Sequence, residues 1–223
     1  NKNDVEKAVE GIDCMVHAAA IISGTDEETF DVNFNGTKNL VEAAKKFKIK
    51  KFIFISTENV LYDYCDDAYT NSKRRAENLV KELKDYIILR PSVIYGKNDN
   101  RYISYLVNFI KKYPIVPILG SGNNILQPVY IGDVVKSVVN SIKYNINGIH
   151  LVCGADSASY KDIIKIAAKM MGVKRLIVCI PLFLLKPLVY IYGKLVKDPK
   201  IKFDSLKYLK YNRQYDASFT ERI

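Results

Sequence analysis

Residues 51–57 read KFIFIST, a short apolar run that ends in two hydroxyl residues. Such a run is typical of a strand that is buried on both faces of a parallel sheet. Ser56 and Thr57 would lie at the carboxyl end of this strand. Because open parallel sheets bind their ligands at that edge, we expect a functional site around these two hydroxyl groups.

Two more apolar runs predict strands. Residues 12–20, IDCMVHAAA, pass from a strand pattern into three small residues, which would let a flat ligand approach the backbone. A long helix is expected over residues 31–44. Residues 86–91, YIILRP, predict a third strand, with residues 92–96 as its tip loop. Strands that alternate with helices predict an α/β fold with a parallel sheet.

A phenol and an amine lie four residues apart in residues 69–73, YTNSK. On a helix, Tyr69 and Lys73 would share one face. A nearby ammonium favours the phenolate and lowers the tyrosine pKa from about 10 toward neutrality, where the group can exchange a proton with a substrate hydroxyl. The spacing alone also occurs on solvated helix faces, so the interpretation depends on the strands that flank it.

Taken together, these motifs resemble the extended short-chain dehydrogenase/reductases, which include NAD-dependent epimerases and dehydratases of nucleotide sugars and the 3-beta-hydroxysteroid dehydrogenases. The resemblance covers about residues 5–155 and is looser beyond. It implies an α/β fold of the Rossmann type, a doubly wound parallel sheet with a smaller C-terminal substrate lobe. The motifs that carry it follow the family's order: Val16-His17-Ala18-Ala19, Asn33 with Gly36-Thr37 and Asn39-Leu40, Ser56-Thr57, Tyr69 with Lys73, Arg90-Pro91 with Tyr95-Gly96, and Gly120-Ser121-Gly122 before Pro128 to Val134.

The resemblance implies roles for single residues. Tyr69 would be the general acid/base, and Lys73 would lower its pKa and hold the nicotinamide ribose of NAD or NADP. Thr57 would hydrogen-bond the reacting oxygen, with Ser56 as the alternative, while Asn33 would help to order Lys73 or a water beside it. Cofactor contacts are expected from His17, Ala18, Ala19, Ile55, Ser56, Tyr69, Lys73, Pro91, Ser92 and Val93, and substrate contacts from Thr57, Glu58 and Tyr95.

One family feature is absent from the sequence. Members begin with a strand and a Gly-x-x-Gly-x-x-Gly turn that holds the cofactor pyrophosphate. Here Gly11 reads as a helix stop and residues 120–122 as a loop. By analogy with the family we expect the sequence to lack about 60 to 70 N-terminal residues, including its first strands and glycine-rich turn. The chain by itself is then expected to bind cofactor poorly and to be inactive, and the choice between NAD and NADP is not readable.

Three functions remain open at this point. The leading expectation is an epimerase or dehydratase that acts on a nucleotide-activated sugar by hydride transfer. Val93 stands where many sugar-nucleotide members carry asparagine, which keeps open a dehydrogenase for an apolar, steroid-like or lipid-linked alcohol or ketone. A non-catalytic member that holds NADP in a larger assembly is the third possibility, although the joint presence of Tyr69, Lys73 and Thr57 speaks against it.

Composition limits the partners. A chain of 223 residues with 48% hydrophobic residues can bury a large core. The net charge of +10 comes from lysines spread over helix faces without a binding motif, so no nucleic-acid partner is expected. Only two histidines occur, neither beside a cluster of ligands, so no metal site is expected. The four cysteines lack a C-x-x-C pair and suit buried free thiols in a reducing compartment, which favours a cytoplasmic location.

The C-terminal third holds an apolar run at residues 177–192 followed by lysines. Two prolines and Lys186 argue against a transmembrane helix. The run predicts a strand and helix of the substrate lobe, or a peripheral membrane contact through residues 177–202. We expect a partial dinucleotide-binding domain at 1–112, rejoined by about 129–152, with the substrate lobe at 113–128 and 153–223. A homodimer is expected by analogy with the family.

Overall fold

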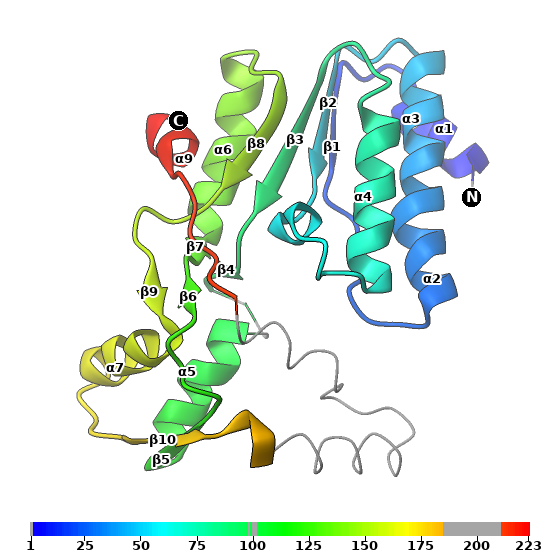
Figure 1. The fold of residues 1–223 in the computed structure, drawn as a ribbon. Coiled ribbons are helices and arrows are strands. Elements are labelled where there is room, and N and C mark those ends of the chain that lie inside the picture. The colour runs from blue at the N-terminus through cyan, green and yellow to red at the C-terminus, as the bar shows by residue number, and fades with distance from the viewer. Residues whose placement is uncertain (1, 98, 100–101, 185–210) are drawn as a thin grey trace. The chain divides into compact units, whose positions relative to one another are not determined.

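The computed structural model describes residues 2–97, 99, 102–184 and 211–223 (Figure 1). The chain divides into two compact units. Unit 1 comprises residues 1–92, 132–153 and 216–223, and unit 2 comprises residues 93–131 and 154–215. Each unit has its own sheets.

Unit 1 is built on a four-stranded parallel sheet. Its strands are β1 (Cys14–His17), β2 (Lys51–Ile55), β3 (Tyr86–Pro91) and β8 (Gly148–Val152), in the order β1-β2-β3-β8. Phe52, Ile53 and Phe54 of β2 are at most 1% exposed, as expected for a strand covered on both faces. The predicted α/β fold with a parallel sheet is therefore confirmed.

Helices cover both faces of this sheet. In Figure 1, α3 and α4 lie side by side on one side of the strands and α6 lies on the other. Apolar side chains of α3 and α4 pack on Phe52 and Phe54 of β2 and form the core of the unit. The helical segments of unit 1 are α1 (Lys2–Val9), α2 (Asp26–Phe30), the π-helix η1 (Asp31–Asn35), α3 (Gly36–Lys46), the 3-10 helix η2 (Glu58–Leu61), α4 (Ala68–Val80), α6 (Ile131–Lys143, whose first residue belongs to unit 2) and α9 (Ser218–Arg222).

Sequence-local signals set the ends of these helices. Thr25 accepts a hydrogen bond from the Glu28 amide while the Glu28 side chain accepts one from the Thr25 amide, so a capping box starts α2. The helix expected over residues 31–44 is present, but it begins as the π-helix η1 before it becomes α3. Asp67 caps α4 by accepting a hydrogen bond from the Thr70 amide at 2.9 Å.

Unit 2 packs α5 (Tyr102–Lys112) and α7 (Tyr160–Met170) against two parallel strands, β5 (Ile115–Leu119) and β10 (Leu176–Ile180). Arg175 donates from Nε to the Ile110 carbonyl and from Nη2 to that of Lys111, so it satisfies carbonyl groups at the end of α5. Two small sheets complete the unit: β4 (Ile94–Tyr95) with β7 (Val129–Tyr130), and β6 (Ile125–Leu126) with β9 (Ala158–Ser159).

The units differ from the domain limits expected from the sequence. Residues 93–112 fall in unit 2, because β4 pairs with β7 and α5 packs against α7. Residues 216–223 fall in unit 1, because α9 contacts β8. The apolar run at 177–192 begins inside β10, and residues 185–202 of the predicted membrane contact lie outside the described residues.

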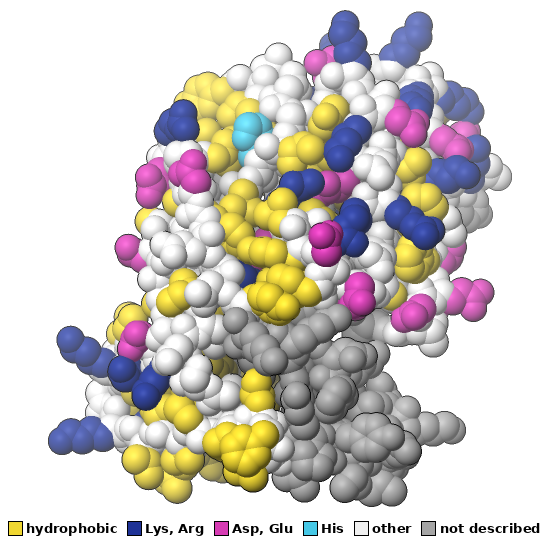
Figure 2. All heavy atoms as spheres, in the orientation of Figure 1, with side chains coloured by type: hydrophobic (Ala, Val, Ile, Leu, Met, Phe, Trp, Pro, Cys, Tyr) yellow, Lys and Arg dark blue, Asp and Glu magenta, His cyan; other side chains and the backbone are white. Residues whose placement is uncertain are grey.

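The surface and the thiols add three facts. On the face shown in Figure 2, Lys and Arg side chains lie among Asp and Glu side chains. All four cysteines are free thiols, but Cys179 is exposed on β10, against the expectation of buried thiols. Within the described ranges, no helix is long and apolar enough to cross a membrane, and no three metal-ligating side chains cluster.

Two glycines give a matched test of backbone packing. A Cβ on Gly154 would lie 2.2 Å from the Pro128 carbonyl oxygen, whereas a Cβ on helical Gly36 would lie 3.9 Å from its nearest neighbour. We expect Gly154→Ala to lower the free energy of unfolding by about 1–3 kcal/mol, because the backbone must move. Gly36→Ala should leave it unchanged or raise it by up to about 1 kcal/mol. Urea unfolding of both variants checks this, and equal stabilities would contradict it.

Candidate active site

Lys73 is the buried amine of the candidate site. It comes from the middle of α4 and is 2% exposed. Its Nζ donates to the Ile55 carbonyl at the carboxyl end of β2 and lies 3.9 Å from the centre of the Phe54 ring. Burial lowers the pKa of Lys73 from 10.5 to about 7, and the charge of Glu77 opposes this shift. The amine therefore changes its charge near neutral pH.

Tyr69 precedes Lys73 by one turn of α4. Because α4 is helical from Ala68 to Val80, the two residues lie on the same face of the helix. Tyr69 is half-buried, so its side chain is partly accessible to a ligand. The structure thus places a phenol and a titratable amine on the helix that packs against β2.

Asn33 joins this helix to the segment that follows β1. It is 1% exposed in the π-helix η1, a form that often occurs at functional sites. Its side chain exchanges two hydrogen bonds of 2.9 Å with the backbone of Ile21 and donates to Ser72 Oγ at 3.1 Å. Ser72 Oγ in turn donates to the Tyr69 carbonyl. These bonds position the backbone of α4, and the expected role of Asn33 in ordering Lys73 or a water beside it stays a prediction.

His17 is a neutral side chain behind the site. It is 5% exposed, and its ring centre lies 5.3 Å from that of Phe54. Thr37 Oγ1 uses its hydrogen to donate to the Asn33 carbonyl at 2.6 Å, so it must accept a hydrogen from His17 Nε2 at 2.9 Å. Burial, helped by the charge of Lys73, lowers the pKa of His17 to about 4. At neutral pH His17 therefore shapes the end of β1 and does not supply a charge.

Small residues follow His17 at the open end of β1. Ala18, Ala19 and Ala20 are exposed, so no large side chain covers the backbone there. A flat ligand could approach this backbone, as the sequence predicts. Pro91 ends β3, two strands away from β1, and Ser92 follows it; both are buried, and the Ser92 amide donates to the Val152 carbonyl of β8.

The two hydroxyl groups after β2 have different surroundings. Ser56 is 5% exposed and donates from Oγ to Glu77 Oε1 at 2.6 Å, so its hydrogen is already used inside unit 1. Thr57 caps η2 by accepting a hydrogen bond from the Asn59 amide, which leaves its own hydroxyl hydrogen for another acceptor. This geometry favours Thr57 over Ser56 for contact with a reacting oxygen. Glu58 follows as a buried residue of η2.

Sequence reasoning missed Glu77, the buried acid of the site. Glu77 is 1% exposed and accepts from Arg90 Nε at 2.9 Å and from Arg90 Nη2 at 2.6 Å, in addition to Ser56. A signal was present, since Glu77 follows Lys73 by the same four residues that separate Tyr69 from Lys73. The three side chains therefore share one face of α4.

Two predicted contact residues belong to unit 2. Val93 accepts a hydrogen bond from the Val129 amide, and Tyr95 is 38% exposed with its ring centre 5.8 Å from that of Tyr130. The structure therefore gathers Tyr69, Lys73, Asn33, Thr57 and the end of β1 in unit 1, whereas Val93 and Tyr95 are described within unit 2.

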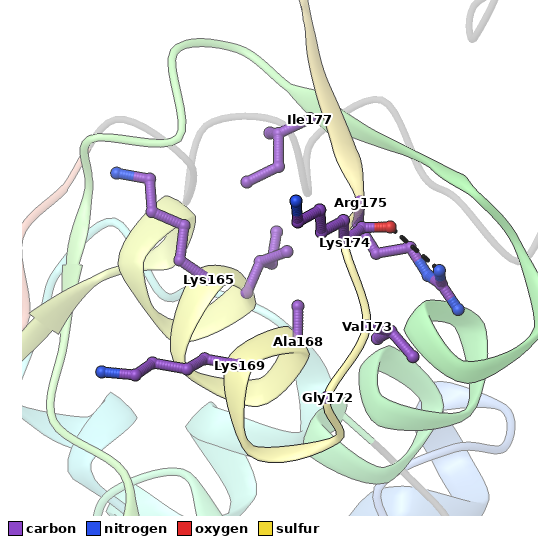
Figure 3. Close-up of a pocket in the computed structure, with 9 residues that line it drawn as sticks. Lys165, Ala168, Lys169, Gly172, Val173, Lys174, Arg175 and Ile177 are labelled. Carbon is purple, nitrogen blue, oxygen red and sulfur yellow. Dashed lines mark hydrogen bonds between the residues drawn. The ribbon is translucent and has the colours of Figure 1, made fainter.

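A groove of about 450 Å³ lies between α7 and β10 of unit 2 and contains no predicted site residue (Figure 3). Figure 3 shows Lys165, Ala168 and Lys169 on the α7 side of this groove. The guanidinium group of Arg175, which lines the groove, donates its hydrogen bonds to carbonyl groups of α5 and of Lys174. We therefore assign the candidate active site to unit 1.

Comparisons with known proteins agree with this geometry. The model of the NAD dependent epimerase/dehydratase family matches residues 1–154. The sterol-4-alpha-carboxylate 3-dehydrogenase (decarboxylating) of Candida albicans is 28% identical over 159 residues, which cover 61% of this chain and 45% of that protein. A 3beta-hydroxysteroid-dehydrogenase/decarboxylase of Arabidopsis thaliana is 22% identical over 98% of this chain and 59% of its own length. The chain thus spans about half the length of these curated relatives.

A solved structure shows the same fold. The UDP-glucuronic acid 4-epimerase from Bacillus cereus in complex with NAD superimposes with a TM-score of 0.69 at 24% identity, covering 93% of this chain and 75% of that one. At this identity the likeness establishes the fold alone. The Rossmann-type doubly wound sheet expected from the sequence is therefore confirmed.

The neutral His17 predicts sensitivity to acid. The unfolded chain binds a proton at this group below about pH 6.5, whereas the folded chain binds it only near pH 4. Stability from His17 is thus complete above pH 6.5 and is lost as the pH falls toward 4, by about 2–3 kcal/mol. Unfolding at pH 7 and pH 4.5 measures the loss. His17→Leu should remove that part of the loss, and His150→Leu, which keeps His17, should not. The prediction is wrong if His17→Leu loses as much stability as the wild type.

Proposed function

The chain belongs to the NAD dependent epimerase/dehydratase family, and from this premise we propose that the protein transfers hydride between a nicotinamide dinucleotide and a secondary alcohol or its ketone. The observation that carries the proposal is the buried amine of Lys73. It lies at the carboxyl end of β2, one helical turn after Tyr69. Burying an amine costs free energy unless the amine is fully paired, so a buried amine with a strongly lowered pKa is a candidate for function.

The residues present at this edge fit a nicotinamide nucleoside. Lys73 has three N–H donors when charged, and the Ile55 carbonyl occupies one of them. On this proposal the remaining donors would bind ribose hydroxyls and the phenol oxygen. The exposed Ala18 and Ala19 would let a planar ring system approach the backbone of β1. When bound, the nicotinamide ring supplies the hydride acceptor or donor that no side chain provides.

The side chains of the protein would exchange a proton with the substrate hydroxyl and hold the substrate in position. The Tyr69 phenol oxygen takes the hydroxyl proton of the substrate, or returns it in the reverse direction. The positive charge of Lys73 favours the phenolate form of Tyr69. Thr57 donates its free hydroxyl hydrogen to the reacting oxygen and fixes the direction in which the alcohol points. Asn33, through Ile21 and Ser72, keeps the start of α4 in place.

Two substrate classes are compatible with this chemistry, and we favour the apolar one. The sequence relatives named above are dehydrogenases of sterol and steroid compounds. Val93, an apolar residue after β3, agrees with a substrate that offers little to hydrogen-bond there. A nucleotide-activated sugar is the second candidate, supported by the name of the structurally similar epimerase, whose likeness shows only the fold.

A substrate panel with the full-length protein separates these classes. NAD and NADP are each titrated, and turnover is then followed with a 3-hydroxysteroid and with UDP-glucuronic acid. Reduction of added cofactor by the steroid supports the favoured class, whereas conversion of the sugar nucleotide to an epimer with tightly held NAD supports the second. Cofactor binding without turnover of either would contradict both and favour a non-catalytic member that holds NADP. Absence of cofactor binding would overturn the proposal altogether.

Tyr69→Phe tests the acid/base assignment. Loss of one hydroxyl group should lower kcat by about 10²–10⁴-fold, because the substrate proton no longer has an acceptor. Stability should change by less than about 1 kcal/mol, since the ring is retained. Tyr105→Phe makes the same change at a site that is 69% exposed on α5 and should leave kcat unaltered. Equal turnover in both variants would refute the role of Tyr69.

Lys73→Met tests whether the amine is kept for function at the expense of stability. The pKa of Lys73 is about 7 in the folded chain and 10.5 in the unfolded chain. Below pH 7 the buried amine is charged in the folded chain, which lowers the free energy of unfolding. This cost decreases as the pH rises from 7 toward 10.5. At pH 6 the free energy of unfolding of the variant should therefore be about 1–3 kcal/mol higher than that of the wild type, while activity is lost. Urea unfolding at pH 6 and pH 9.5 measures this, and a variant less stable than the wild type at pH 6 would contradict it.

A further inference from the structure

Glu77 is the most buried acid in contact with the candidate site. We infer that Glu77 is a positioning residue of this site: its carboxylate holds the ends of β2 and β3 against α4 and keeps the Lys73 amine positively charged. The role of that charge in catalysis rests on the proposed function, whereas the charge itself can be measured without turnover.

The geometry of Glu77 supports the first part of the inference. Its two oxygens accept three hydrogen bonds, one from Ser56 at the end of β2 and two from Arg90 near the end of β3. Ser56 and Glu77 are at most 5% exposed, and the Arg90 side chain is 18% exposed. The carboxylate therefore joins α4 to two neighbouring strands at the edge where ligands bind in parallel sheets. A bidentate arginine pair of this kind also fixes the carboxylate in direction.

The surroundings of Lys73 support the second part. The side chain of Glu77 follows that of Lys73 by one turn on the same face of α4, and its charge favours the ammonium form. From β2 the amine meets only the Ile55 carbonyl and the Phe54 ring, which carry no full charge. The amine also interacts electrostatically with His17 of β1, which is neutral above about pH 4. Tyr69 of α4 is the group whose phenolate Lys73 would stabilise.

Arg90 of β3 acts on Lys73 through the same carboxylate. Arg90 Nη2 lies 2.6 Å from Glu77 Oε2 and arginine stays charged at every relevant pH, so its positive charge partly offsets the field of Glu77 at Lys73. The amine of Lys73 is therefore balanced between loss of hydration, which favours the neutral form, and one buried acid that is shared with Arg90. Removal of the Glu77 charge should therefore shift this balance toward the neutral amine.

Glu77→Gln is the test, because it keeps the size of the side chain and removes its charge. The titration of the Lys73 amine in the full-length protein is followed by NMR of the ¹³C-labelled lysine Cε, assigned with Lys73→Met. The midpoint should lie near pH 7 in the wild type and about one pH unit lower or more in Glu77→Gln. Glu77→Asp, which restores the charge, should recover most of the shift. Glu82→Gln, an exposed acid paired with Lys45, is the matched control and should not move the midpoint.

The pH–rate profile gives the functional readout. If Glu77 keeps Lys73 charged, its removal deprives Tyr69 of its cation, so the acidic limb of the kcat/KM profile should move to higher pH in Glu77→Gln but not in Glu82→Gln. A folded Glu77→Gln protein whose Lys73 titration is unchanged would overturn the inference, even if activity falls. A shifted titration in a protein that turns over no substrate would support the inference about charge and count against the proposed function alone.

The double variant Glu77→Met/Arg90→Met keeps the inference testable if Glu77→Gln does not fold. It removes both buried charges together, which an apolar pair of similar size can replace without leaving an unpaired charge. The midpoint of Lys73 should fall in this variant as in Glu77→Gln, because the acid that favours the ammonium form is gone. A midpoint that stays in place would overturn the inference.

Discussion

Burial of one amine at the end of a parallel strand is the constraint on which the site depends. Lys73 is almost fully buried. In place of water its amine contacts the Ile55 carbonyl and the face of the Phe54 ring, and the charge of Glu77 favours its ammonium form. The carbonyl and the ring belong to β2, and the acid belongs to α4. The strand β2 must end at Ile55, Phe54 must face α4, and α4 must hold its register to within a fraction of a turn, or the amine is left without partners.

The polar groups around Lys73 show how that register is maintained. Asn33 fixes the start of α4 through Ser72 and also binds the backbone of Ile21, while Glu77 fixes the next turns of α4 to β2 and β3. Both side chains are about 1% exposed and make several hydrogen bonds, so loss of either leaves buried partners unsatisfied. The helix is thus held at both ends of the segment that carries Tyr69 and Lys73, which keeps the phenol and the amine in a constant relation.

The sequence was sufficient to predict the parallel sheet, and it located several residues of the candidate site on the elements that carry them. The strand at 51–55 could be predicted because its apolar run is covered on both faces, and the position of Thr57 follows from the strand that precedes it. Glu77 could not be assigned in the same way, because an acid on a helix is ordinarily solvated and only the approach of Arg90 from β3 shows that it is buried. The division of the chain after Ser92 likewise has no local signal, since the pairing of β4 with β7 joins residues about 35 apart.

The path of the chain between the units bears on how substrates could be changed. The chain leaves unit 1 after Ser92, at the carboxyl end of β3, and again after Cys153, just beyond β8. In a parallel sheet these ends lie at the same edge as Ser56 and the Lys73 amine. The segments of unit 2 therefore branch from this edge of the sheet, whereas β2, α4 and the hydrogen bonds between them lie wholly within unit 1. Under the proposed function, the proton-transfer groups of unit 1 can therefore stay the same while residues of unit 2 change, in keeping with the steroid and sugar-nucleotide enzymes named among proteins of similar sequence or fold.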